Sequence, residues 1–189
     1  MKRYLFFVIL LLSIFFVSCA TEKSIQEPSS PQEKCYAPGW NEGDSWRFTG
    51  DRGGQWEEKI IREGDTFKIK QTSNKGYYGI FGVLRPDLFP LWVGKKIEGT
   101  VESETVQGYP ISCPYSFKVI GVVDIKVEAG TFKCWKIEYK TYSTSFGVSD
   151  LGIGYYYYSP ETKSVIKFFT QSQFLAAWEN YELLSFNLR

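Results

Sequence analysis

Histidine is absent from this 189-residue chain. Without an imidazole there can be no Ser-His-Asp triad, no Cys-His dyad and no zinc site with histidine ligands. The sequence also lacks a Cys-x-x-Cys pair, a glycine-rich phosphate loop, a Gly-x-Ser-x-Gly elbow and a calcium-loop pattern. We therefore expect no cofactor, no metal site and no catalytic residues, and the domain is not predicted to be an enzyme.

An excess of either charge is missing as well, since 22 Lys and Arg stand against 21 Asp and Glu. A chain this close to neutral has no field that would attract nucleic acid, and we expect no nucleic-acid partner. Acidic pairs such as Glu57-Glu58 are predicted to lie in strands, where neighbouring side chains point to opposite faces and cannot converge. An enzyme that works without histidine is therefore only the third hypothesis for this chain.

A hydrophobic run long enough to cross a membrane is also lacking. The run from Tyr4 to Val17 is free of charge, but it has 14 residues, whereas a transmembrane helix needs about 20. Lys2 and Arg3 precede it, and small residues follow it. This arrangement predicts a secretory signal peptide over residues 1–18.

Ser18 and then a lone cysteine, Cys19, follow this run. Ser18-Cys19 resembles the lipobox of bacterial lipoproteins, in which the cysteine receives acyl chains such as palmitate and becomes the mature N-terminus. The resemblance implies anchoring in a membrane of the cell envelope through lipid on Cys19. Ala20 at the next position implies the outer membrane, facing the periplasm, if the organism has two membranes. Ordinary cleavage after Ala20 is the alternative interpretation of the same residues.

Residues 19–34 are predicted to be a lipidated, flexible tether, because Pro, Ser and alternating charges leave too little apolar surface to fold. One β domain is expected over residues 35–189. Ten short runs there are rich in β-branched and aromatic residues and are separated by turn residues. They are residues 45–50, 55–63, 66–73, 77–84, 95–103, 115–127, 131–142, 154–159, 163–170 and 181–188. We predict an all-β fold: a single antiparallel meander of about ten strands, forming a curved sheet or half-open barrel.

Little helix is expected beyond the signal peptide, and only residues 88–93 and 172–178 could be helical. One hairpin can be predicted in detail. If residues 128–130 form a three-residue loop with Gly130 in the left-handed region, Val123 pairs with Trp135 and Val119 with Tyr139. Val119, Val123, Trp135, Ile137 and Tyr139 would then form a core face.

Three cysteines remain after Cys19, namely Cys35, Cys113 and Cys134. An exported compartment permits disulfides, so one bridge and one spare thiol are expected. Cys113 and Cys134 fall on opposite faces of the predicted hairpin and cannot join directly. A bridge that includes Cys35 is favoured, with Cys113 as the preferred partner.

Aromatic residues are abundant, with 6 Trp, 13 Tyr and 15 Phe. Most are expected to pack in the β core. The functional hypothesis is that the concave side of a curved sheet binds an apolar ligand. Its candidate residues are Trp92, Trp135, Tyr139, Tyr155 and Tyr157, with Trp92 on a projecting lip between Pro90 and Gly94.

Three segments, VEAGTFKCWKI, YYSPETKSVIKF and ELLSF, resemble uncharacterised exported β domains of bacteria. Those domains have a meander or half-barrel shape that is loosely similar to lipoprotein-carrier proteins. The resemblance implies this fold for roughly the last 100 residues and implies no activity. We therefore expect an anchored, non-catalytic lipoprotein that binds a lipid or acyl chain, and a partner in an envelope assembly is the alternative.

Overall fold

The computed structural model describes residues 33–73, 86–104, 110–143, 150–171 and 180–189. The predicted signal peptide, Cys19, most of the tether, the 77–84 strand and the 172–178 helix lie outside these residues. A single 3₁₀ turn, η1, covers Pro86–Leu88. The strands are β1 (Ser45–Gly50), β2 (Gln55–Glu63), β3 (Thr66–Ser73), β4 (Lys96–Glu104), β5 (Pro110–Val127), β6 (Gly130–Ser143), β7 (Asp150–Ser159), β8 (Ser164–Thr170) and β9 (Tyr181–Asn187).

These nine antiparallel strands form one unclosed sheet in the order β3-β2-β1-β9-β8-β7-β6-β5-β4. The predicted all-β fold with a curved meander sheet is confirmed. The sheet consists of two meanders, β1–β3 and β4–β9, which are joined where β1 pairs with β9. Consecutive strands β3 and β4 do not pair, and they form the two edges of the described sheet.

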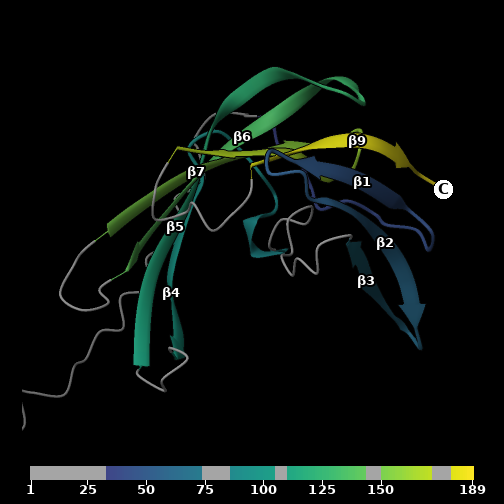
Figure 1. Cartoon of the computed structure of the whole chain (residues 1–189). Coiled ribbons are helices and arrows are strands. Elements are labelled where there is room, and N and C mark those ends of the chain that lie inside the picture. The colour runs from purple at the N-terminus through teal and green to yellow at the C-terminus, as the bar shows by residue number, and fades with distance from the viewer. Residues whose placement is uncertain (1–32, 74–85, 105–109, 144–149, 172–179) are drawn as a thin grey trace, which may run out of the picture.

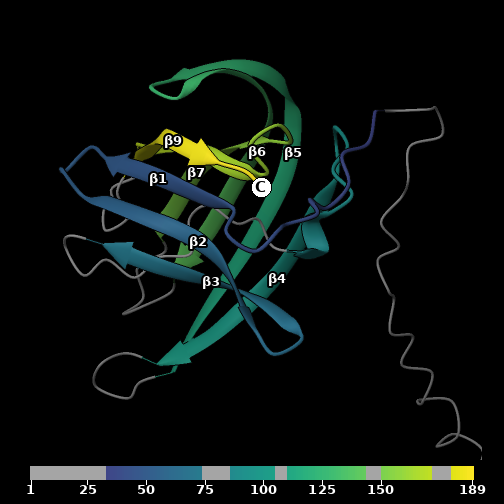
Figure 2. The same cartoon turned by 90° about the vertical axis from the view of Figure 1, so that its right-hand side faces the viewer.

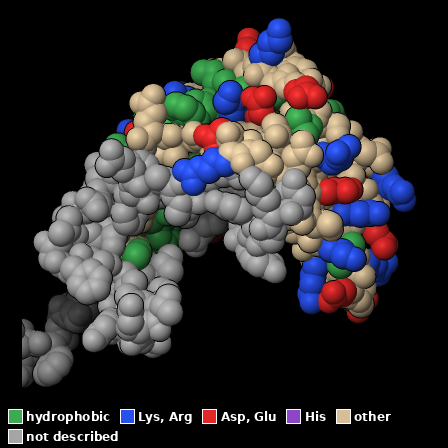
Figure 3. All heavy atoms as spheres, viewed as in Figure 1, with side chains coloured by type: hydrophobic (Ala, Val, Ile, Leu, Met, Phe, Trp, Pro, Cys, Tyr) green, Lys and Arg blue, Asp and Glu red, His purple; other side chains and the backbone are tan. Residues whose placement is uncertain are grey.

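The sheet curves into an arch, with β4 and β5 in one arm and β2 and β3 in the other (Figure 1). Residues 86–95 lie between the arms, and the ring of Phe89 contacts that of Tyr158, with centroids 5.3 Å apart. The face of the sheet that carries Tyr158 is therefore the inner face of the arch. On the molecular surface, basic and acidic side chains are intermixed over the β2–β3 arm (Figure 3).

Strand β2 shows why the sheet has a dry side and a wet side. Its side chains alternate between exposed and buried from Gln55 to Ile60. Trp56 and Ile60 belong to the hydrophobic core, whereas Glu57 lies in solvent. The neighbouring carboxylate of Glu58 is 1% exposed, so the Glu57-Glu58 pair does not converge, as the strand period requires.

The predicted register of the β5–β6 hairpin is wrong. Its turn consists of two residues, Glu128 and Ala129, and pairing begins with Val127 opposite Gly130. Strand β5 then contains a bulge between Val119 and Gly121, which places Val119 opposite Ile137. A bulge adds one residue to the strand, so residues on its two sides that would share a face in a regular strand lie on opposite faces. Val119 is therefore buried, whereas Val123, four residues later, is 37% exposed.

The hairpin tip curls back over β9 (Figures 1 and 2). The backbone amide of Ala129 donates a 3.2 Å hydrogen bond to the carbonyl of Leu183. The rings of Phe132 and Phe186 meet edge to face at 5.8 Å. This contact buries both faces of β6 near the tip, so that the neighbours Cys134 and Trp135 are both in the core.

A buried carboxylate joins the beginning and the end of the domain. Asp44 is fully buried, and it accepts hydrogen bonds from the backbone amides of Asn41 and Arg189, at 2.9 Å and 2.7 Å. Its third partner is the Lys163 ammonium, 3.2 Å away. Burial alone would raise the pKa of Asp44, but these three partners outweigh it and hold the pKa below its ordinary value.

Candidate apolar-ligand site

A continuous row of aromatic rings crosses the inner face of the sheet. Neighbouring rings have centroids 4.8 to 6.1 Å apart, in stacked, tilted or edge-to-face geometry. Each of seven strands, from β5 to β2 in spatial order, contributes one ring. This aromatic row consists of Phe117, Tyr139, Tyr156, Phe168, Tyr181, Phe48 and Trp56. Pairs of this kind contribute roughly 0.5–1.5 kcal/mol beyond the area they bury, so the row stabilises the seven strands between the two edge strands.

The buried phenol groups of the row carry no charge. Burial, followed by the neighbouring Tyr156 and Glu58, raises the pKa of Tyr181 well above its ordinary value. Burial likewise raises the pKa of Tyr156, with Tyr139 as the second cause. Both hydroxyls therefore stay neutral throughout the physiological pH range.

An open hollow of about 340 Å³ lies beside this row, where β8 and β9 diverge. The two strands share only two register pairs, Lys167 with Glu182 and Phe168 with Tyr181. Phe168 and Tyr181 belong both to the aromatic row and to the lining of the hollow. The half-buried ring of Phe169 adds a third aromatic group to that lining. The lining is therefore mainly apolar.

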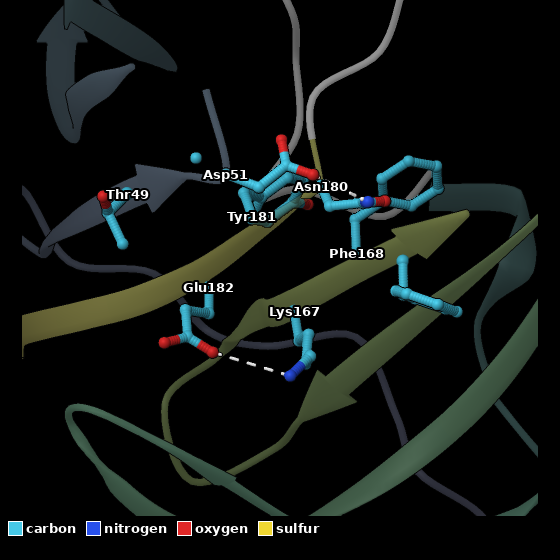
Figure 4. A pocket seen from close by; sticks show the side chains of 9 residues that line it. Thr49, Asp51, Lys167, Phe168, Asn180, Tyr181 and Glu182 are labelled. Carbon is cyan, nitrogen blue, oxygen red and sulfur yellow. Dashed lines mark hydrogen bonds and ion pairs between the residues drawn. The ribbon is translucent and has the colours of Figure 1, made fainter. Parts of the chain in front are cut away.

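Polar groups surround the hollow (Figure 4). The Lys167 ammonium lies 3.5 Å from the Glu182 carboxylate. The side chain of Asn180 donates to the Asp51 carboxylate at 2.9 Å and accepts from the backbone amide of Thr170 at 2.7 Å. Asn180 therefore connects the end of β8 to the turn between β1 and β2 through its side chain.

The residues predicted to bind the ligand do not form one site. Trp135 and Tyr139 lie on the inner face and are 4% and 9% exposed. Tyr155 and Tyr157 lie on the outer face, with their ring centroids 4.6 Å and 5.8 Å from the Lys136 ammonium. Strand pairing brings Tyr155 opposite Phe169, next to the hollow.

Trp92 does not project from a lip. Its side chain is 5% exposed, and the Lys95 ammonium lies 4.6 Å from the ring centroid. Lys95 is itself buried and donates to the carbonyl of Pro90 at 3.1 Å. Burial therefore lowers its pKa, with Asp87 opposing the shift.

The three described cysteines are free thiols, and the expected bridge between Cys35 and Cys113 is not formed in the structure. Burial, followed by the charge of Glu33, raises the pKa of Cys35 to about 11. Burial, then Asp124 and Glu161, raises the pKa of Cys134 to about 12. Both thiols are protonated at neutral pH and are therefore poor nucleophiles.

The hollow was not anticipated from the sequence, although all its aromatic residues fall in runs that were predicted as strands. Phe168 and Phe169 belong to the run at 163–170, and Tyr181 begins the run at 181–188. What the sequence did not reveal is the pairing of β1 with β9, which completes the row between Tyr181 and Phe48. The available signal was that successive side chains of a strand point to opposite faces of the sheet. This rule places Phe168 and Phe169 on opposite faces of β8.

Within the described ranges, no group of three or more Cys, Asp or Glu side chains is placed to hold a metal ion. In the same ranges, no helix is long and apolar enough to cross a membrane.

No protein-family model matches the chain, and no curated protein matches it. Two solved structures are similar to it. One, from Bacteroides fragilis, is assigned as an exported protein with a YmcC-like fold; it has 9% identity and a TM-score of 0.46, over 81% of this chain and 99% of its own. The other, from Parabacteroides distasonis, is assigned as a lipoprotein; it has 12% identity and a TM-score of 0.49, over 82% and 100%. TM-scores below 0.5 give these likenesses no weight for the function of this chain.

Proposed function

We propose that the chain is a lipoprotein of the bacterial cell envelope whose β domain binds an apolar ligand without catalysing a reaction. The basic start, the 14-residue apolar run and Ser18-Cys19 support export and lipidation. Two or more acyl chains on Cys19 hold a protein on a bilayer, whereas one chain binds only reversibly. In an organism with two membranes, Ala20 favours the outer membrane, with the domain facing the periplasm.

The observation that carries ligand binding is the hollow of about 340 Å³ that lies directly against the aromatic row. Pockets for small ligands are concave, mostly apolar and roughly 300–1,000 Å³, with a few polar groups that fix orientation. The accessible aromatic ring is that of Phe169, because Phe168 and Tyr181 line the hollow but are only 0% and 3% exposed. The Lys167–Glu182 ion pair and Asn180 supply the polar rim (Figure 4).

A ligand with an apolar chain and one polar end fits this distribution of groups. Its chain would pack against Phe169, and its polar end would meet the Lys167 ammonium or the Asn180 amide. The Lys167 ammonium and the Asn180 amide already have partners within the protein. We therefore expect these two groups to orient the ligand. A lipid or another acyl-bearing molecule is the ligand class that we assign.

Native mass spectrometry of the detergent-extracted, lipidated protein tests this proposal, and a co-purified apolar molecule is the expected result. A dansylated fatty acid then serves as a probe of the site. Thr49→Trp should fill the hollow and weaken binding of the probe by tenfold or more. The matched control is Thr72→Trp on the edge strand β3, where the side chain is exposed. Equal binding by the two variants, with both still folded by circular dichroism, would contradict the assignment.

A role in an envelope protein assembly is the second candidate, and the β3 edge favours it. Among the strands that the structure describes, β3 pairs only with β2, and Phe67 on it is 51% exposed. An edge strand of this kind can accept a strand from another chain, although Lys68 and Lys70 oppose unspecific pairing. A photo-crosslinking residue at position 67 in intact cells would trap the partner. Recovery of the uncrosslinked protein alone would count against this role.

A further inference from the structure

Three of the exposed apolar side chains of the described chain lie at the end of the domain where the tether begins. Five large hydrophobic residues are exposed, and Tyr36 is the most exposed of them, at 70%. Cys35 and Leu91 form an isolated antiparallel β-bridge, in which the backbone amide of each residue donates to the carbonyl of the other, at 2.9 Å and 2.7 Å. Tyr36 and Val93 each lie within two residues of this β-bridge. Val93 is 43% exposed.

A third exposed residue, Ile120, belongs to the same end. The carbonyl of Val119 accepts from the Gly94 amide, and the Val119 amide donates to the Lys95 carbonyl, both at 2.8 Å. These bonds hold the bulge of β5 against residues 94 and 95. Ile120 is the residue after Val119 and is 37% exposed. Three of the five exposed hydrophobic residues therefore lie around one junction, and Figure 2 shows residues 33–40 beside residues 86–95 there.

The beginning of the described chain is fixed at this junction. The Glu33 carboxylate lies 3.5 Å from the Lys133 ammonium on β6. The Lys34 ammonium lies 5.8 Å from the ring centroid of Trp92. The chain that leads back to Cys19 therefore leaves the domain from this end.

The length of that chain decides which surface faces the bilayer. Fourteen residues lie between Cys19 and Lys34. A flexible tether of that length has a root-mean-square span of roughly 20 Å, and full extension gives about 50 Å. A domain held so closely presents the end that carries the tether to the membrane. Tyrosine, with an apolar ring and a polar hydroxyl, is a side chain that membrane interfaces favour.

We infer that Tyr36, Val93 and Ile120 form a membrane-docking surface, which rests on the interface of the bilayer that holds the Cys19 lipid. This inference depends on the lipid anchor of the proposed function and not on ligand binding. It gives the anchored domain a defined orientation. The hollow between β8 and β9 would then keep a constant position relative to the membrane.

An environment-sensitive thiol probe tests this surface in the full-length, lipidated protein, reconstituted in phosphatidylethanolamine–phosphatidylglycerol vesicles. Cys35→Ser and Cys113→Ser remove the accessible thiols, while Cys134 is fully buried. Val93→Cys then carries the probe at the proposed surface. Phe67→Cys, on the opposite edge of the sheet, is the matched control, because Phe67 is an exposed apolar residue far along the sheet from β5.

The expected result is that emission from position 93 shifts to shorter wavelength and is quenched by lipids that carry a quencher, whereas position 67 responds to neither. Adding Tyr36→Ser and Ile120→Ser should reduce the quenching at position 93. Emission typical of water at both positions, or equal quenching at both, overturns the docking surface while leaving the anchor intact. Intact mass measured on the same sample reports the lipid on Cys19. Protein without that lipid overturns the anchor, and the docking surface with it.

Discussion

The backbone amide of Arg189, the last residue of the chain, donates a 2.7 Å hydrogen bond to the carboxylate of Asp44, just before the first strand. This bond ties the end of β9 to the beginning of β1, the two strands that join the meanders. The side chain of Arg189 also lies over Gly43, where an added β-carbon would meet its Nε at 2.8 Å. The buried carboxylate of Asp44 therefore stabilises the pairing of β1 with β9, which joins the two meanders.

Asp44→Asn should lower the free energy of unfolding by about 2–3 kcal/mol. The substitution removes the charge that binds Lys163 and two backbone amides in a buried site, and lost partners of this kind are costly. Chemical denaturation measures the effect. Asp65→Asn is the control, because that side chain is fully exposed and its Arg62 partner lies 3.8 Å away. The control should change stability by less than about 0.5 kcal/mol. Equal effects of the two variants would show that Asp44 does not hold the junction.

The stability that Asp44 confers should disappear in acid. Its pKa in the folded protein is depressed, so its contribution is complete above the unfolded value of about 3.9 and is lost as the pH falls through the lower folded value. The difference in unfolding free energy between the wild type and Asp44→Asn should therefore be constant from pH 7 to 5 and shrink below about pH 4. A difference that stays constant down to pH 2 would argue against this.

The alternation of apolar and polar residues predicted the strand bounds well. The runs at 45–50, 55–63 and 66–73 coincide with β1, β2 and β3. Alternation failed where the chain departs from a regular strand. The bulge next to Val119 places Val123 on the other face, so the predicted core face was right for Val119, Trp135, Ile137 and Tyr139 and wrong for Val123.

Long-range pairing was the second feature that the sequence concealed. Turn residues predict which consecutive strands pair, but nothing in residues 45–50 indicates that they pair with residues 181–187, which lie more than 130 positions away. The aromatic row and the hollow depend on that pairing. The predicted candidate residues included none from β8 or β9, so they missed Phe168, Phe169 and Tyr181.

Gly130→Val should destabilise the β5–β6 hairpin by about 1–3 kcal/mol. Gly130 has a φ of 142°, which other residues rarely adopt, and an added β-carbon would lie 3.2 Å from the Phe132 ring. Thermal unfolding followed by circular dichroism measures the loss. Gly121→Val is the matched control on the same hairpin, where an added β-carbon meets no atom within 4 Å. If both variants melt at the same temperature, the backbone of Gly130 is not the constraint that we describe.

Thiol titration of the denatured mature protein should count three free groups, Cys35, Cys113 and Cys134. The proposed lipid on Cys19, attached through a thioether, would remove the fourth. In the native protein Cys134 should be unreactive, since it is fully buried and its pKa is about 12. A count of one would indicate one disulfide among these three cysteines, which peptide mapping would then assign, and a count of four would indicate an unmodified Cys19.

We propose that lipid on Cys19 holds the β-sheet domain on a membrane, and intact mass analysis of the protein extracted from cell membranes is the most decisive test. We expect a chain that starts at Cys19 and carries acyl groups, and we expect Cys19→Ala to yield a folded domain in the soluble fraction. A mature chain that starts unmodified at Thr21, or one that still carries residues 1–18, would rule out anchoring through Cys19.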